Sequence, residues 1–416
     1  MPRFAPLLVL LGCSTALPVV AQEPAPGVAE EFRRLDRNQD GRVTFEEAGA
    51  RVSVIRSADA DRSGHVSLEE LREFLRERRS RKTTPAPKAE PKHLVNPFPE
   101  DAPVSESTCR VAGDYSAKRN GYSFLVMWNG EVLFERYDQG WTPESAHRLA
   151  SGTKSFSGVM LAAAVKDELL TLDEPVAKTL TEWQSDPKLS KITYRHLLSL
   201  TSGIDPGGIG RVRSYRAAVE EVKAVQLPGK KFAYGPNAFQ IFGEALRRKL
   251  EARTDLKFAD PLAYLQDRVL DPIGMDIADW RRDADGMPNL PSGVWLTARE
   301  WAKFGEFLRQ GGSWNGTTLI DAKTLTECLQ GSEANPGYGL TFWLLGKAET
   351  RTQGAPGLEE GLQKTSGPLA GAYMAAGAGK QRLYVLPNQN LVVVRQGESR
   401  NFDDNEFLGR LLGLKP

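Results

Sequence analysis

The chain has 416 residues, with 54 Lys and Arg against 53 Asp and Glu, four His and three Cys. A hydrophobic fraction of 40% is ordinary for a globular protein, and this length allows two or three domains. The balanced charge creates no long-range field that would attract nucleic acid or anionic lipid, and three Cys are too few for a disulfide-stapled scaffold.

The N-terminus has the features of an export signal. Arg3 precedes an apolar run that ends at Leu11, and small residues around Ala21 precede a polar segment. This pattern predicts a signal peptide over residues 1–21 and an exported protein, periplasmic or extracellular. The apolar run is shorter than the ~20 residues that span a bilayer, so no transmembrane segment is expected. Leu-Leu-Gly before Cys13 leaves a second interpretation open, a lipoprotein signal with a lipid anchor on Cys13.

Two twelve-residue segments have the oxygen-rich spacing of a calcium-binding loop. The segment Asp36–Glu47 reads D-R-N-Q-D-G-R-V-T-F-E-E, and Asp59–Glu70 repeats its pattern. Oxygen donors stand at positions 1, 3, 5 and 12, position 7 offers its backbone carbonyl, and Gly at position 6 permits a sharp turn. The predicted Ca²⁺ ligands are Asp36, Asn38, Asp40, Arg42, Glu47, Asp59, Asp61, Ser63, His65 and Glu70.

These two loops resemble a paired EF-hand, an all-α module that here covers residues 28–79. Val43 and Val66, at position 8 of each loop, are expected to pair the loops through a short strand contact. The flanking segments 28–35 and 68–75 have helical apolar spacing. A polar turn would explain one such loop but hardly two in tandem. Because Ser63 replaces an acid and extracellular calcium modules bind at ~10⁻⁴ to 10⁻³ M, a structural ion is expected.

A Pro-rich segment separates this module from the rest of the chain. Residues 80–103 carry repeated Pro among Lys, Thr and Ala without apolar periodicity, which predicts an extended tether. The remaining residues, 104–416, are enough for a large domain. If the protein is exported, Cys109 and Cys328 of this domain could pair, although the sequence does not show that they meet.

Hairpin signals at both ends of the large domain predict its sheet. Asn129-Gly130 separates strand-like runs at 123–128 and 131–136, and a Pro-Asn-Gln-Asn turn separates 382–386 from 391–396. Helical apolar spacing lies between these hairpins, at 158–170, 194–200 and 239–250. This order predicts an α+β fold in which the two ends of the domain complete one antiparallel sheet with helices around it.

The segment from Ser151 to Lys154 reads S-G-T-K and opens a long apolar helix. Ser-x-x-Lys on a helix places the ammonium one turn from the hydroxyl, and a desolvated Lys can act as a general base. The helix N-terminus would also favour negative charge developing at Ser151. A second match, Ser185 to Lys188, lies in a polar stretch with Pro187 inside it. On these residues alone, Ser151 as a simple helix start is an equal alternative.

Further segments resemble the serine β-lactamase and penicillin-binding superfamily, in the family's order. Residues 193–203 read T-Y-R-H-L-L-S-L-T-S-G, residues 228–237 read P-G-K-K-F-A-Y-G-P-N, and Trp280–Thr297 carries landmarks of class C-like members. The resemblance covers about residues 104–412. It implies a β-lactamase/transpeptidase-like fold, an antiparallel sheet flanked by helices with a helical subdomain.

The resemblance also implies roles for individual residues. Ser151 would be the nucleophile, Lys154 its base and Tyr234 the group that relays the proton to the leaving group. Backbone N–H groups of Ser151 and of a strand residue near Ala378 would form the oxyanion hole. The residues expected to contact the substrate are Asn237, Gly377, Ala378 and Gly379.

Two departures from the family pattern bear on the substrate. Asn237 stands three residues after Tyr234 instead of two, with Pro236 in the usual place. The Lys-Thr-Gly box is missing from 376–381, which read A-G-A-G-K-Q, and we interpret the similar Lys364–Gly367 as a decoy within a Gly-rich insertion. Without that cation, the resemblance favours the family VIII esterase and 6-aminohexanoate-dimer-hydrolase-like branch.

The sequence therefore predicts an exported serine hydrolase that cleaves an ester, amide or β-lactam bond through an acyl-serine, with calcium-binding EF-hands and no catalytic cofactor. The chain has no Gly-x-Ser-x-Gly elbow of an α/β-hydrolase and no His-Glu-x-x-His zinc motif. The alternative is a non-catalytic protein of the penicillin-binding fold that binds peptidoglycan or peptides, with calcium-dependent docking of a partner.

Overall fold

The computed structural model describes residues 28–48, 55, 58–61, 63–74, 92–345, 367, 369–399 and 401–414. The predicted signal peptide with Cys13, residues 80–91 of the predicted tether, and Lys364 of the decoy box lie outside the described residues. The chain divides into two compact units, Met1–Thr84 and Pro85–Pro416. Among the described residues, no helix has both the length and the hydrophobicity needed to cross a bilayer.

The first unit is built around two paired calcium-type loops. Helix α1 (Val28–Leu35) precedes strand β1 (Arg42–Thr44) and helix α2 (Phe45–Ala48), and strand β2 (His65–Ser67) leads into helical residues 68–74. Strands β1 and β2 are antiparallel, with the buried Val43 directly opposite the buried Val66, so the predicted strand contact is confirmed. The small core around this pair contains Phe32, Ala48, Ile55, Ala58 and Leu71.

The second unit contains a seven-stranded antiparallel sheet in the order β11-β12-β13-β14-β4-β5-β3. The strands are β3 (Lys92–Val95), β4 (Gly121–Trp128), β5 (Glu131–Tyr137), β11 (Trp343–Leu344), β12 (Tyr373–Gly377), β13 (Gln381–Leu386) and β14 (Leu391–Gly397). Both predicted hairpins are present, and the first turns at Asn129 and Gly130, whose φ values of 51° and 86° fit a type I′ turn. Since β14 pairs with β4, the two ends of the domain meet in the sheet as predicted.

The edge strand β3 corrects the predicted tether. Residues 92–95 pair antiparallel with β5, Lys92 opposite Tyr137 and Val95 opposite Phe134. The C-terminal part of the predicted 80–103 tether therefore belongs to the sheet. Four residues reading Lys-His-Leu-Val show no apolar alternation, because an edge strand of this length is held mainly by backbone hydrogen bonds to its neighbour.

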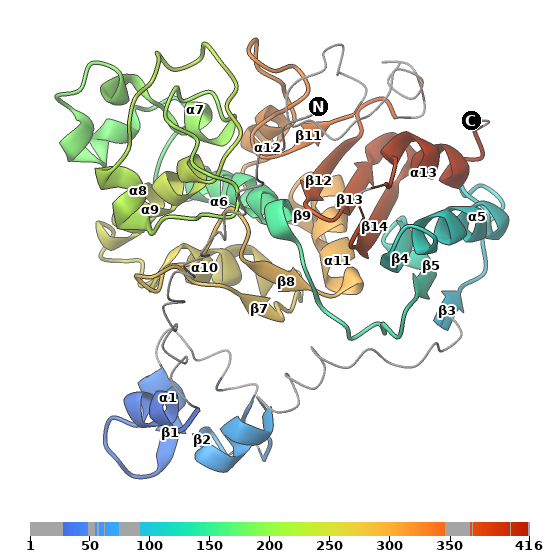
Figure 1. Ribbon diagram of the computed structural model, residues 1–416, viewed down its shortest axis with the longest axis horizontal. Coiled ribbons are helices and arrows are strands. Elements are labelled where there is room, and N and C mark those ends of the chain that lie inside the picture. The colour runs from blue at the N-terminus through green and yellow to red at the C-terminus, as the bar shows by residue number, and fades with distance from the viewer. Residues whose placement is uncertain are drawn as a thin grey trace, which may run out of the picture. The chain divides into compact units, whose positions relative to one another are not determined.

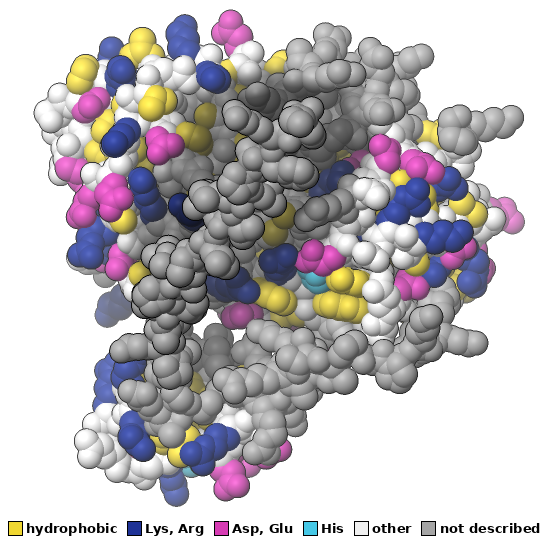
Figure 2. Space-filling model, in the orientation of Figure 1, with side chains coloured by type: hydrophobic (Ala, Val, Ile, Leu, Met, Phe, Trp, Pro, Cys, Tyr) yellow, Lys and Arg dark blue, Asp and Glu magenta, His cyan; other side chains and the backbone are white. Residues whose placement is uncertain are grey.

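Helices cover both faces of the sheet. Helices α5 (Glu106–Ala117) and α13 (Asp404–Leu411) pack together on one face, and α11 (Ala298–Arg309) packs on the other (Figure 1). Capping side chains begin these helices, Ser105 at α5, Thr297 at α11 and Asp403 at α13. The visible face of the molecule intersperses basic with acidic side chains, in keeping with the balanced charge (Figure 2).

A mostly helical region lies between β5 and β11 in the sequence. Besides α11, its α-helices are α6 (Ser155–Lys166), α7 (Tyr194–Leu198), α8 (Tyr215–Glu220), α9 (Asn237–Glu251), α10 (Pro261–Leu265) and α12 (Ala322–Cys328). Its short strands are β6 (His147–Arg148), β7 (Asp279–Trp280) and β8 (Val294–Leu296), which form a small sheet, and the pair β9 (Ser313–Trp314) and β10 (Thr317–Thr318). The unit is thus the predicted α+β arrangement of an antiparallel sheet with a helical subdomain.

The two cysteines of this unit are not joined. Cys109 on α5 and Cys328 on α12 are both free thiols and both fully buried. Burial raises the pKa of each thiol to about 12. The pairing left open by the sequence is not formed in this structure.

Candidate active site

Ser151 lies on a short 3₁₀ turn, η2 (Ala150–Lys154), that runs directly into α6. The turn begins with Ala150 in the left-handed region at φ 48°, a conformation that costs a non-glycine residue free energy. Strand β8 holds this conformation, because Leu149 N–H donates to the carbonyl of Val294 at 3.0 Å. Thr153 Oγ1 adds a bond to the Ala150 carbonyl at 2.7 Å and accepts from Val294 N–H at 3.2 Å. The backbone around Ser151 is therefore rigidly set.

Lys154 places its ammonium group beside the Ser151 hydroxyl. Its Nζ lies 3.2 Å from Ser151 Oγ and donates to the carbonyl of Pro291 at 3.0 Å. The side chain is buried, and this burial lowers the pKa of Lys154 to about 7. A substantial fraction of the side chain is then a neutral amine at neutral pH, which is the state a general base requires.

Tyr234 lies beside Lys154 and Ser151. Its ring centroid lies 5.0 Å from Lys154 Nζ, and the Ser151 side chain is near enough to its hydroxyl to affect the pKa of the phenol. Burial raises the pKa of Tyr234, while the Ser151 side chain acts in the opposite direction, so the resting group is a protonated phenol. The predicted 193–203 stretch helps to position it, since Ala233 N–H donates to the carbonyl of Leu200 at 2.8 Å.

The end of β12 lies directly against the η2 turn that carries Ser151. A Cβ on Gly377 would overlap the carbonyl oxygen of Leu149 and come within 3.1 Å of Gly152 N, so only glycine allows this approach. Ala378 and Gly379 continue from Gly377 into a tight turn, in which Gly379 has φ 79°. The structure thus brings Gly377, one of the predicted substrate-contacting residues, against the turn that carries Ser151, and Ala378 and Gly379 follow it in the chain.

Asn237 is not among the hydrogen-bond partners of Lys154 in the described part of the chain. It begins α9, is 1% exposed, and donates from Nδ2 to the carbonyl of Asp205 at 3.0 Å. The second acceptor at Lys154 is instead the backbone carbonyl of Pro291. The extra residue before Asn237 turns its amide toward the 205–207 loop, where its Oδ1 has no hydrogen-bond partner among the described residues.

Three aromatic residues lie around Tyr234. We define the aromatic wall as Phe232, Tyr338 and Trp343. The ring centroids of Tyr338 and Trp343 lie 6.4 Å and 5.8 Å from that of Tyr234, and Phe232 lies 5.3 Å from Tyr338. Phe232 belongs to the 228–237 box, whereas no motif marked Tyr338 or Trp343, although aromatic residues are dense in 338–343. Tyr338 and Trp343 are buried, so the wall packs apolar side chains around the Tyr234 ring.

The buried His147 and the half-buried His196 make no hydrogen bond to Ser151, Lys154 or Tyr234 among the described residues. His196 caps α7, where its Nδ1 accepts from Thr193 N–H at 3.2 Å. His147 is hydrogen-bonded through Nδ1 to the carbonyl of Arg148 at 2.8 Å, and burial lowers the pKa of both rings. The second Ser-x-x-Lys match is also separate, because Lys188 Nζ donates to the carbonyl of Ala224.

The second loop of the first unit has the donor arrangement of a cation site. Carboxylate oxygens of Asp59, Asp61 and Glu70 lie within 4.8 Å of one another, and Oε1 of Glu70 is buried without a hydrogen-bond partner among the described residues. Gly41 and Gly64, at position 6 of each loop, have φ of 80° and 84°. An all-oxygen donor set with one orphaned carboxylate oxygen fits a hard cation such as Ca²⁺.

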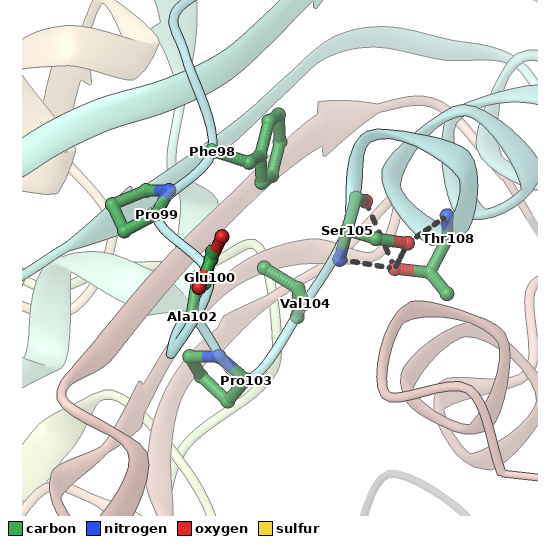
Figure 3. Close-up of a pocket in the computed structure, with 8 residues that line it drawn as sticks. All are labelled: Phe98, Pro99, Glu100, Ala102, Pro103, Val104, Ser105 and Thr108. Carbon is green, nitrogen blue, oxygen red and sulfur yellow. Dashed lines mark hydrogen bonds between the residues drawn. The ribbon is translucent and has the colours of Figure 1, made fainter.

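A shallow pocket at the start of α5 is separate from this chemistry. It is lined by residues of one segment, Phe98, Pro99, Glu100, Ala102, Pro103, Val104, Ser105 and Thr108 (Figure 3). The hydrogen bonds drawn there are those of the Ser105–Thr108 capping box. These bonds serve the helix start, and none of the predicted catalytic residues lines the pocket.

Comparison with known proteins agrees with this arrangement. A family model described as Beta-lactamase matches residues 92–406, and one described as EF hand matches residues 28–47 and 52–75. An uncharacterized protein of Alkalihalophilus pseudofirmus is 22% identical over 310 residues, covering 66% of this chain and 83% of its own length.

Three solved structures share the fold at low sequence identity. A penicillin-binding protein homologue from Caulobacter crescentus has a TM-score of 0.58 at 15% identity, covering 78% of this chain and 98% of its own. A family VIII carboxylesterase has a TM-score of 0.57 at 16% identity, covering 78% of this chain and 98% of its own. A proposed 6-aminohexanoate-dimer hydrolase from Bacillus anthracis has a TM-score of 0.56 at 18% identity, covering 72% of this chain and 79% of its own. The predicted fold is confirmed.

Proposed function

The chain belongs to the beta-lactamase family and carries an EF-hand pair, and on this premise we propose that it is a serine hydrolase acting through an acyl-Ser151 intermediate. The observation that carries the proposal is the 3.2 Å contact between Ser151 Oγ and the buried Nζ of Lys154. An amine with a pKa of about 7 in this position can remove the hydroxyl proton at neutral pH.

The reaction would follow from these positions. Neutral Lys154 takes the proton of Ser151 as its Oγ attacks the substrate carbonyl carbon. Backbone N–H groups of Ser151 and of the strand end at Ala378 hold the resulting oxyanion. Tyr234 donates a proton to the leaving group as its bond to carbon breaks, and Lys154 returns a proton to Tyr234. Water then hydrolyses the acyl-serine by the reverse sequence of proton transfers.

We propose an ester or amide as substrate in preference to a penicillin. The strand end beside the Ser151 turn reads Gly-Ala-Gly, and the Lys380 that follows is paired with Asp404, so this strand end offers no unpaired cation to hold a penicillin carboxylate. The aromatic wall adds apolar side chains around Tyr234. The structural similarity to a carboxylesterase and to a proposed amide hydrolase supports the same choice.

Covalent labelling tests the enzyme proposal. A fluorophosphonate probe should label the wild-type protein and Ser185→Ala equally, and fail to label Ser151→Ala. The wild-type protein and Ser185→Ala should hydrolyse p-nitrophenyl acetate equally, and Ser151→Ala should not hydrolyse it. Absence of both labelling and hydrolysis of esters, amides and β-lactams by the wild-type protein would reject the enzyme and favour the non-catalytic peptidoglycan- or peptide-binding alternative.

We also propose that the two loops of the first unit bind Ca²⁺. Asp59, Asp61 and Glu70 would hold the ion in the second loop, with Asp36 and Glu47 in the first. The ion would supply charge neutralisation that lets the clustered carboxylates stay ionised. Isothermal titration of the full chain should show calcium binding that weakens in Glu70→Gln, and a chain that releases no heat on titration would contradict it.

Export is the remaining part of the proposal. It rests on the pattern of residues 1–21, which is compatible with two mature N-termini, Gln22 or an acylated Cys13. Intact-mass analysis of the protein from its native host should give a chain that begins at Gln22. A chain that begins at an acylated Cys13 would establish the lipoprotein form, and an uncleaved chain would contradict export through this signal.

A further inference from the structure

Buried side chains hold four consecutive carbonyl groups at the end of β12. We call residues 377–380 the strand-end turn. The contacts are Arg382 Nη1 to Gly377 O (3.3 Å), Gln381 Nε2 to Ala378 O (3.3 Å), and Arg395 Nη1 to Gly379 O (3.2 Å) and Lys380 O (2.8 Å). All three donors come from the neighbouring strands β13 and β14.

These donors are costly groups to bury. Arg382 is 3% exposed and Arg395 is 0% exposed, and the two stand directly opposite each other on adjacent strands. Like charges in such a cross-strand pair destabilise a sheet. Arg382 is paired with Asp404 at 2.5 Å, whereas the partners of Arg395 are the Ser116 hydroxyl and backbone carbonyl groups. Apolar residues of similar volume often replace such groups without loss of stability.

The contacts fix the direction of the peptide planes in the turn. In a trans peptide the carbonyl of one residue and the N–H of the next point in opposite directions. Holding the Gly377 carbonyl against Arg382 therefore turns the Ala378 N–H away from Arg382. Without these contacts a glycine-rich turn has no side chain of its own that would oppose a peptide flip. A flipped plane would present a carbonyl oxygen where the oxyanion must form.

We propose that Arg382, Gln381 and Arg395 are positioning residues that preorganise the strand-end turn as one side of the oxyanion hole. The inference rests on the proposed serine-hydrolase function. It gives the buried arginines a role that packing alone does not require. They act through the backbone of residues 377–380, whose first residue, Gly377, lies against the Ser151 turn at Leu149 and Gly152.

The test compares an ester with its thiono analogue, in which sulfur replaces the carbonyl oxygen. Sulfur is larger and a weaker hydrogen-bond acceptor, so the thionoester gains little from an oxyanion hole. Arg382→Lys keeps a cation for Asp404 but loses the planar fork that reaches Gly377. We expect kcat for the oxoester to fall about 10²-fold, the scale of a 1 Å misplacement, with KM within about twofold. The ratio of the oxoester rate to the thionoester rate should therefore fall together with kcat for the oxoester.

Arg395→Lys and Gln381→Asn should show the same signature, because each shortens or narrows a donor to the turn. Arg136→Lys is the matched control, since this buried guanidinium pairs with Asp138 and Asp114 away from the turn. It should leave the ratio unchanged. Melting temperatures identify the variants that fold. A folded variant of any of the three that keeps the wild-type ratio, or loses both rates equally, would overturn the inference. An inert wild-type protein would instead reject the serine-hydrolase function itself.

Discussion

At Lys154 the fold buries an amine that ordinarily carries a charge. The residue lies one helical turn from Ser151, and its Nζ reaches only Ser151 Oγ and the Pro291 carbonyl among its described hydrogen-bond partners. The sequence predicted the pairing with Ser151 from the Ser-x-x-Lys spacing. Its pKa depends on burial by residues far away in the chain, which spacing does not reveal.

The activity of the wild-type protein should follow the titration of Lys154. Because the neutral amine is the base, kcat/KM should fall about tenfold per pH unit below pH 7 and level off above it. A pH profile from 5 to 9 with p-nitrophenyl acetate measures this. A rate that rises as pH falls below 7 would contradict the assignment of Lys154 as base.

The free energy of unfolding should also depend on pH through the titration of Lys154. The folded pKa of Lys154, about 7, is below the ordinary value of 10.5, so the unfolded chain binds more protons between these pH values. Wild-type stability therefore gains from this group as pH rises from 7 to 10.5. Lys154→Met should be more stable than wild type by about 1–3 kcal/mol at pH 6, because it removes a buried charge. Thermal melts at pH 6 and 9 should show the advantage shrinking, and an advantage that grows would contradict the burial argument.

The buried thiols give a second prediction at the scale of single residues. Cys109 and Cys328 are free, and burial raises the pKa of both to about 12, so neither offers an accessible thiolate. Protein that begins at Gln22 should react with no equivalent of a thiol reagent when native and with two when unfolded. Loss of the two equivalents after unfolding without reductant would show a disulfide instead.

At the scale of elements, the site depends on one strand end meeting one turn. The hairpins β4–β5 and β13–β14 were predictable because turn-forming residues separate their two strand-like runs in the sequence. Strand β12 was harder to see, since its sequence Tyr-Met-Ala-Ala-Gly is buried throughout and has no alternation. Its contact with η2 joins segments more than two hundred residues apart.

A single methyl group should break this contact. In Gly377→Ala the new Cβ would overlap the Leu149 carbonyl, and backbone on both sides has little freedom to move. We expect a loss of stability of about 3 kcal/mol, the upper range for overpacking, and a fall in kcat of about 10²-fold. Gly409→Ala on α13 is the control, because no atom lies within 4 Å of its new Cβ. It should keep full activity and gain up to about 1 kcal/mol. Equal behaviour of the two variants would contradict the close approach.

At the scale of the whole molecule, the chain combines two compact units with separate cores. The first unit pairs its loops through Val43 and Val66, and the second carries the residues around Ser151. Each unit is therefore expected to respond to its own ligand.

Calcium should stabilise the first unit and leave hydrolysis unchanged. Calorimetry should give two transitions, and Ca²⁺ at ten times its Kd should stabilise only that of the EF-hand unit, by about 1.4 kcal/mol for each loop that binds an ion. Chelation should not alter the rate of ester hydrolysis. In Glu70→Gln the calcium-dependent shift should shrink, because the second loop loses its closing carboxylate. A chelator-sensitive rate, or a shift of both transitions, would show that the units are coupled.

The sequence by itself determined the local features: the calcium loops, the two hairpins, the order of the motifs and the Ser151–Lys154 pair. Each is encoded within a few residues, where spacing and turn chemistry act directly. The tertiary structure decided the rest. It placed Asn237 against the 205–207 loop, added β3 to the sheet, gathered the aromatic wall around Tyr234, and set Arg382 and Arg395 behind the strand-end turn. These features depend on contacts between distant segments and on burial, which a one-dimensional pattern does not contain.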